Sequence, residues 1–167
     1  MNYIACIGSR ALNADEQNLC YKIGQFLSQN YIIKTGNAVG ADQSYARGVN
    51  SIDPTKLWLY LPWESYNIDA IVKGNCIVCW EPKKEWYSIA KELHLYWDSL
   101  KFGGKSLHAR NVGIIENVEY VVAFPNQGNG GGTGMGMRMA ARNSIPVYNL
   151  REDKERKRWD ACSRLNI

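Results

Sequence analysis

The first apolar run of the chain reads Tyr3-Ile4-Ala5-Cys6-Ile7-Gly8-Ser9-Arg10, and apolar residues at helical spacing follow it over residues 15–27. An apolar run, a glycine turn and an amphipathic stretch in this order predict a strand, a tight loop and a helix. The order recurs where Tyr31-Ile32-Ile33 leads into Thr35-Gly36-Asn37-Ala38-Val39-Gly40-Ala41-Asp42 and a helical stretch to residue 49. Two consecutive units of this kind indicate an α/β fold with a parallel sheet.

The remainder of the chain continues this alternation. Further strands are predicted at residues 57–61, 76–80, 120–124 and 146–150, and helices at residues 86–100, 105–117, 134–142 and in the tail 151–167. We therefore expect a single Rossmann-like, nucleotide-binding domain over residues 1–167, with five or six parallel strands, helices on both faces and a pocket at the strand carboxyl ends. Residues 65–104 are expected to form an aromatic-rich insertion, since residues 58–97 hold five of the six tryptophans.

The composition is that of an ordinary soluble domain. The 167 residues are 46% hydrophobic and 22% charged, and no stretch approaches the roughly 18 to 20 apolar residues needed to cross a bilayer. Because no secretion signal is recognisable, we expect a cytoplasmic protein without a membrane partner, in the host cytoplasm if the protein is viral. The formal charge of +4 is modest, so it permits a nucleic-acid partner without favouring one.

Five cysteines are an odd number, so they cannot all pair within the chain, and we interpret them as reduced thiols. Cys76-Ile77-Val78-Cys79 has the spacing of half a zinc site. The chain offers no second pair of this kind, and His94 and His108 fall at no recognised ligand spacing. We therefore predict neither a metal site nor a cofactor.

Three glycine-containing loops follow predicted strands, and the richest is Gly128-Asn129-Gly130-Gly131-Gly132-Thr133-Gly134. Glycine lets a ligand approach the backbone closely, and the amides at a helix N-terminus attract phosphate, although glycine also simply shapes turns. Since ligands bind beyond the carboxyl ends of parallel strands, we expect this loop, Gly8-Ser9 and the loop 36–40 to converge on one crevice. The spacings match neither a P-loop nor a dinucleotide-binding fingerprint, which argues against an ATPase or a NAD-dependent dehydrogenase.

Polar side chains near these loops supply the remaining candidates. Arg110 could hold a phosphate or carboxylate, or be a surface arginine on an ordinary helix. Asp42 could bind a ribose hydroxyl or be a helix N-cap, and Trp63 could face a base, whereas most other aromatic residues of 58–97 are expected in the core or at an interface. The predicted ligand-binding residues are Gly8, Ser9, Arg10, Gly36, Asn37, Asp42, Trp63, Arg110, Asn111, Gly130, Gly131, Gly132, Thr133 and Gly134.

Five blocks in this order resemble the SLOG superfamily of Rossmann-like domains: Ile7–Arg10, Thr35–Asp42, Leu107–Asn111, Val121–Pro125 and Gly130–Gly134. The superfamily includes the DNA-processing protein DprA, the LOG phosphoribohydrolases and nucleotide-sensing domains of antiphage receptors. The likeness covers most of the chain outside residues 65–104 and is most specific over residues 107–134. The chain most resembles the short DprA-like proteins of phages.

The resemblance implies three functions. In LOG enzymes a glutamate follows the glycine loop, but here the loop continues as Gly134-Met135-Gly136-Met137-Arg138. Glu64, Glu116 or Glu119 would have to replace the missing acid. We therefore expect non-catalytic binding of a small nucleotide, an ADP-ribose-like molecule or a cyclic nucleotide signal by a homo-oligomer, in one hypothesis as a phage protein that sequesters an immune signal. The alternatives are a LOG-type N-glycosidic hydrolase and a DprA-like protein that binds single-stranded DNA.

Overall fold

The computed structural model describes residues 2–71, 76–128 and 130–164, and its centre is a sheet of six parallel strands. The strands are β1 (Tyr3–Gly8), β2 (Ile32–Thr35), β3 (Leu57–Tyr60), β4 (Ile77–Cys79), β5 (Tyr120–Phe124) and β6 (Val147–Asn149). Their order is β4-β3-β2-β1-β5-β6, which confirms the predicted Rossmann-like fold. The chain reverses its direction of strand addition between β1 and β5, and this reversal opens a crevice at their carboxyl ends.

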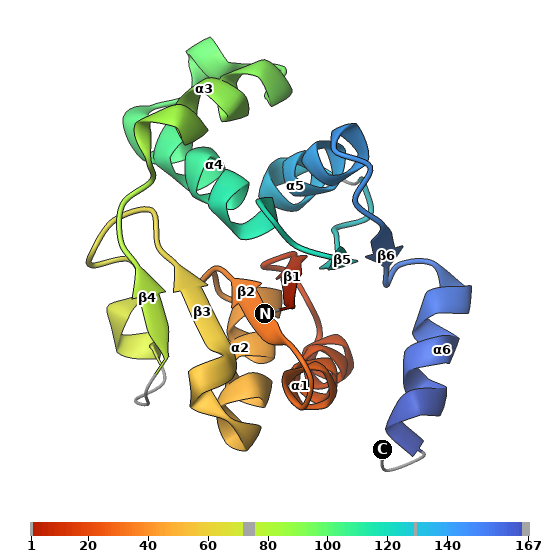
Figure 1. The fold of residues 1–167 in the computed structure, drawn as a ribbon. Helices are drawn as coiled ribbons and strands as arrows, with labels where there is room; N and C mark the ends of the chain where they lie inside the picture. The colour runs from red at the N-terminus through yellow and green to blue at the C-terminus, as the bar shows by residue number, and fades with distance from the viewer. Residues whose placement is uncertain (1, 72–75, 129, 165–167) are drawn as a thin grey trace.

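Helices cover both faces of the sheet (Figure 1). One face carries α1 (Ala14–Ser28) and α2 (Ala41–Ile52), and the other carries α4 (Phe102–Ile115) and α5 (Gly131–Arg142). Helix α3 (Lys84–Leu93) packs on the outside of α4, and α6 (Asp153–Arg164) lies on the α1 side. Successive residues of a strand point to opposite faces, so Ile4 and Cys6 pack with α1 and α2, whereas Ala5 and Ile7 pack with α4 and α5. The two hydrophobic cores are therefore separated by the sheet.

Helices α1 and α2 approach each other at two glycines. A Cβ atom on Gly24 would clash with the carbonyl of Tyr45, and one on Gly48 would clash with the carbonyl of Tyr21. The start of α1 is fixed by a capping box, in which the Asn13 side chain accepts from the Glu16 amide at 2.9 Å and the Glu16 carboxylate accepts from the Asn13 amide at 3.0 Å. This close packing holds the β1–α1 and β2–α2 loops beside each other.

Two predicted helices differ from the structure. The helix expected over residues 86–100 ends at Leu93, because the chain turns so that His94 Nδ1 accepts a hydrogen bond from the Tyr96 amide, and Trp97–Ser99 form a separate turn. Helix α5 begins at Gly131 rather than at residue 134, although glycine has a low helix propensity. Asn111 of α4 supports its first turn by donating to the Gly132 carbonyl at 3.3 Å. The glycines therefore belong to the helix N-terminus itself.

The aromatic rings of residues 58–97 divide between the core and the surface. Tyr60, Trp86 and Trp97 are buried in the core, as predicted, whereas Trp63, Trp80 and Tyr96 are exposed. In the predicted tail helix, Trp159 packs edge-to-face on Phe26 at a centroid distance of 5.8 Å. Cys6, Cys20, Cys76 and Cys79 are free thiols, and the Cys162 side chain lies outside the described residues.

Candidate functional site

A cavity of about 460 Å³ lies beyond the carboxyl ends of β1 and β5. Its volume falls in the range of about 300 to 1,000 Å³ that is usual for small-molecule sites. The cavity is walled by the β1–α1 loop, the start of α2, one side of α4 and the β5–α5 loop. The lining residues are Ile7, Gly8, Ser9, Arg10, Ala11, Ala38, Asp42, His108, Arg110, Asn111, Asn126, Gly130, Gly131, Gly132 and Thr133.

Ten of the fourteen predicted binding residues line this cavity, and Gly36, Asn37, Trp63 and Gly134 do not. Five lining residues were not predicted: Ile7, Ala11, Ala38, His108 and Asn126. Two of these had a usable signal, since Asn126 follows a predicted strand and His108 lies two residues before Arg110. The three loops therefore do converge, while the assignment of individual residues to a ligand stays a prediction.

The N-terminus of α5 points its amides at the cavity. The first amides of a helix have no acceptor within the helix, and no described side chain caps α5. Gly130 is the N-cap, Gly131 has a φ of +66°, and a Cβ atom on either would meet open space. Asn126 Oδ1 accepts a hydrogen bond from the Gly130 amide at 3.1 Å and shapes the loop. Open space and unpaired amides together suit an anion.

Arg110 brings a buried positive charge to the cavity from α4. Its side chain is 4% exposed, and Nη1 donates to the Tyr60 carbonyl at 3.0 Å. Its Nε is buried and has no hydrogen-bond partner among the described residues. Burial lowers the pKa of Arg110, whereas the nearby carboxyl of Asp42 raises it. A buried donor without a partner costs free energy, and an acceptor that reached this nitrogen would remove that cost.

Gly36 lies outside the cavity lining but makes room for its two charged residues. A Cβ atom on Gly36 would collide with Nη1 of Arg110 and with Oδ2 of Asp42. The guanidinium and the carboxyl therefore pack against bare backbone of the β2–α2 loop. This explains why glycine is required here without any contact to a ligand.

Asp42 is the only acidic residue that lines the cavity within the described part of the chain. It is 5% exposed and occupies the second position of α2, so the N-cap interpretation is wrong, because Gly40, with a φ of +94°, is the N-cap. Burial raises the pKa of Asp42 to about 6, although Arg110 and backbone hydrogen bonds from Ala38 and Gly8 oppose the shift. A carboxyl of this kind titrates close to neutral pH.

Asn37 connects the β2–α2 loop to the irregular segment after β3. Its buried side-chain amide donates to the carbonyls of Tyr66 at 3.2 Å and Asn67 at 2.9 Å, and Asn67 Nδ2 donates back to the Asn37 carbonyl at 2.9 Å. We call this pair the asparagine clasp. It places the Tyr66 ring 5.7 Å from the guanidinium carbon of Arg110, and Trp63, 37% exposed, packs edge-to-face on Tyr66 at 5.1 Å.

His108 lines the cavity two residues before Arg110. Burial, together with His94, Arg138 and Arg110, lowers its pKa to about 4, so the ring is neutral at neutral pH. The three glutamates considered as replacements for the missing acid do not line the cavity. Glu116 and Glu119 lie at the opposite end of the sheet, since the Glu119 amide donates to the carbonyl of Tyr3 at the start of β1.

Within the described residues, no cluster of three or more His, Cys, Asp or Glu side chains is arranged to hold a metal ion. No described helix is long and apolar enough to span a membrane. The cavity itself combines a helix N-terminus, a buried arginine and a buried carboxyl.

Comparison with known proteins by sequence finds no matching family profile and no matching curated protein. Solved structures do match. DNA processing protein A from Helicobacter pylori, studied for its single-stranded DNA binding, is 18% identical with a TM-score of 0.65 over 89% of this chain and 64% of that protein. The corresponding protein from Streptococcus pneumoniae gives 18% identity and a TM-score of 0.63 over 89% of this chain and 50% of that protein.

A molybdenum cofactor binding protein from Rippkaea orientalis is similar as well, with 18% identity and a TM-score of 0.61 over 98% of this chain and 85% of that protein. This chain therefore shares the Rossmann-like fold of these proteins, which is the fold class that the sequence predicted. This chain spans about half to two-thirds of the length of the two DNA processing proteins. At this level of identity the likeness describes the fold, and the ligand has to be argued from the cavity itself.

Proposed function

We propose that the cavity binds a small phosphorylated ligand derived from a nucleotide and holds it without chemical change. The observation that carries this proposal is the buried guanidinium of Arg110, whose Nε lacks a partner among the described residues, in the same cavity as the open N-terminus of α5. A phosphate would accept hydrogen bonds from both and would offset the buried charge. A neutral ligand could accept these hydrogen bonds but would not offset the charge.

The two ends of the cavity favour different chemical groups. The α5 end offers amides and open space, which suits a phosphate, while Asp42 offers a carboxyl that accepts hydrogen bonds and suits a hydroxyl group. A sugar phosphate presents both groups. The neighbours support binding in this fold without selecting the ligand, since one is described as binding single-stranded DNA and another as binding the molybdenum cofactor.

The finer proposal is that the bound molecule is a nucleotide immune signal and that the protein sequesters it on behalf of a phage. It is motivated by the motif likeness to short phage proteins and by the missing glutamate after Thr133. When the protein is added in excess over the signal, it should suppress the activity of a receptor that the nucleotide activates, and the Arg110→Ala variant should not. Homo-oligomerisation stays a prediction that light scattering of the purified protein tests.

A second candidate is an N-glycosidic hydrolase that uses Asp42. The observation in its favour is that this carboxyl lines the cavity and has a pKa raised to about 6, which is suitable for proton transfer near neutral pH. Such an enzyme would consume the ligand. Asp42→Asn would then abolish turnover while leaving binding of the intact substrate measurable.

One experiment separates the two candidates. The purified protein is incubated with nucleoside monophosphates, ADP-ribose, cyclic ADP-ribose isomers and cyclic dinucleotides, washed, denatured and analysed by mass spectrometry. Recovery of an intact compound from the protein at about one per protein supports binding, whereas loss of a panel member with free base and sugar phosphate in the wash supports hydrolysis. A protein that retains nothing and leaves every panel member intact contradicts both.

The contribution of Arg110 is then measured by titration of the recovered compound. Arg110→Ala should weaken binding tenfold or more, because losing a charge-assisted hydrogen bond costs about 1.5 to 3 kcal/mol. Arg142→Ala is the matched control, since Arg142 forms an exposed ion pair with Glu92 and does not line the cavity. Equal affinity of the two variants would remove Arg110 from the site.

A further inference from the structure

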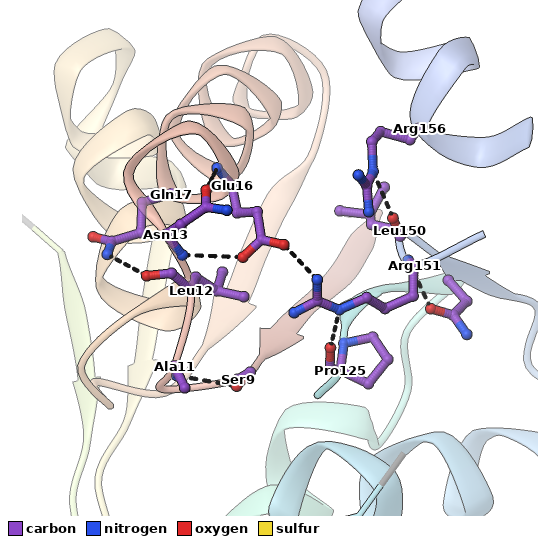
Figure 2. Close-up of polar contacts among 11 residues, drawn as sticks. Ser9, Ala11, Leu12, Asn13, Glu16, Gln17, Pro125, Leu150, Arg151 and Arg156 are labelled. Carbon is purple, nitrogen blue, oxygen red and sulfur yellow. Dashed lines mark hydrogen bonds and ion pairs between the residues drawn. The ribbon is translucent and has the colours of Figure 1, made fainter. Parts of the chain in front are cut away.

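Arg151 bridges two of the loops that line the cavity without lining it itself (Figure 2). It lies in the turn after β6. Its Nε donates to the carbonyl of Pro125 at 2.7 Å, and its Nη1 forms an ion pair with Glu16. The guanidinium carbon also lies 4.6 Å from the ring centroid of Phe124. One side chain thus contacts the end of β5, the β5–α5 loop and the first turn of α1.

Both partners of Arg151 are themselves tied to the cavity wall. Pro125 directly precedes Asn126, whose Oδ1 accepts from the Gly130 amide at the start of α5. On the other side, Glu16 completes the capping box of α1 with Asn13, directly after the loop 9–11 that lines the cavity. A displacement of Arg151 would therefore act on both loops at once.

The contacts require the shape of arginine. A planar guanidinium directs Nε to a carbonyl and Nη1 to a carboxylate at the same time, whereas the single ammonium of lysine provides one charged centre. The Arg151 and Glu16 side chains are 24% and 15% exposed, compared with 55% and 60% for the surface pair of Arg142 and Glu92. Arg156 adds support, because its Nε donates to the Leu150 carbonyl at 3.2 Å.

We infer that Arg151 is a positioning residue that holds the β1–α1 and β5–α5 loops at the separation needed to bind a phosphate, and so raises affinity without touching the ligand. This inference rests on the proposed function for its effect on affinity. A site that is already in its binding geometry loses less conformational freedom when the ligand arrives. The C-terminal turn after β6 is thereby part of the binding apparatus.

Three variants test this inference: Arg151→Ala, Arg151→Lys and the control Arg142→Ala. With adenosine 5′-monophosphate and ADP-ribose as probes, both Arg151 variants should bind at least fivefold more weakly than the original protein, and Arg142→Ala should bind equally well. If Arg151→Lys binds as weakly as Arg151→Ala, the two directed hydrogen bonds of the guanidinium, and not its positive charge alone, are needed for affinity. Rescue by lysine, or unchanged affinity in Arg151→Ala, would overturn the inference.

A second readout does not depend on any ligand. In hydrogen exchange, amides of residues 9–13 and 126–134 should exchange faster in Arg151→Ala than in Arg142→Ala, at equal global stability. If neither probe binds the original protein, hydrogen exchange alone decides the inference, while the full ligand panel described above decides the proposed function. Should Arg151→Ala not fold, Glu16→Gln removes the ion pair while keeping an oxygen for the Asn13 amide, and unchanged exchange in that variant would refute the inference.

Discussion

Helices α2 and α5 both begin at the cavity after a glycine N-cap, but their first turns carry opposite features. The second residue of α2 is Asp42, a buried carboxyl that accepts hydrogen bonds from the backbone of Ala38 and Gly8. The second residue of α5 is Gly132, and neighbouring Gly131 faces open space. The protein therefore supplies its own anion to one helix N-terminus and leaves the other free, which is why we assign the phosphate to α5.

The largest effect is expected when the second residue of α5, Gly132, is replaced by the aspartate that α2 carries at its second position. Gly132→Asp would place a carboxylate where the phosphate is expected, so affinity for a nucleoside monophosphate should fall at least a hundredfold, about 3 kcal/mol. Titration calorimetry at pH 8 measures this.

The steric control for that variant is Gly132→Ala. Its Cβ atom would lie 2.8 Å from Asn111 Nδ2, and the aspartate variant shares this crowding. The alanine variant should lose less than tenfold in affinity. If both variants bind equally, charge at the α5 N-terminus is irrelevant to binding.

The next largest effect is on stability and concerns the buried carboxyl of Asp42. Folding raises the pKa of Asp42 from 3.8 to about 6, so the folded protein holds this proton more tightly than the unfolded chain. The associated stability is present below about pH 4 and is lost as the pH rises through 6. Asp42→Asn avoids this loss and should raise the free energy of unfolding at pH 8 by about 1 to 2 kcal/mol. The full pKa shift of Asp42 corresponds to roughly 3 kcal/mol, and the expected gain is smaller because an amide accepts fewer hydrogen bonds than a carboxylate.

Urea denaturation of both proteins at pH 5 and pH 8 tests this. The stability difference should grow from pH 5 to pH 8. His108, whose pKa is lowered to about 4, adds a pH dependence of opposite sign, which is common to both proteins and cancels in the difference. A difference that is constant with pH would show that Asp42 does not titrate as its surroundings indicate.

The smallest expected effect comes from the asparagine clasp, which positions Tyr66 on Arg110. Asn67 has a φ of +47°, so Asn67→Gly keeps the backbone conformation and removes the hydrogen bond to the Asn37 carbonyl. Affinity for the same probe should fall about three- to fivefold, corresponding to one neutral hydrogen bond of about 0.5 to 1 kcal/mol. Asn117→Gly is the control, because Asn117 also has a positive φ of +58° but does not line the cavity. Equal losses in both variants would assign the effect to backbone flexibility.

The sheet and the convergence of the glycine loops could be predicted because each depends on local order along the chain. Apolar runs that end in glycine specify parallel strands, and parallel strands bring the following loops to one edge. The roles of Gly36 and Asn37 could not be read in this way. Gly36 accommodates side chains from α2 and α4, and Asn37 bonds to a segment thirty residues away.

Local sequence patterns are enough to define the fold class, the edge of the sheet that carries the cavity and the glycines that open it, because periodicity and glycine conformation act over a few residues. Only the folded chain shows that α5 starts within its glycines, that Asp42 is buried with a pKa of about 6, and that Arg151 connects Glu16 to Pro125. These features depend on burial and on contacts between residues up to 135 positions apart. Such contacts produce no repeating pattern of residue types along the sequence, so they can be identified only in the folded structure.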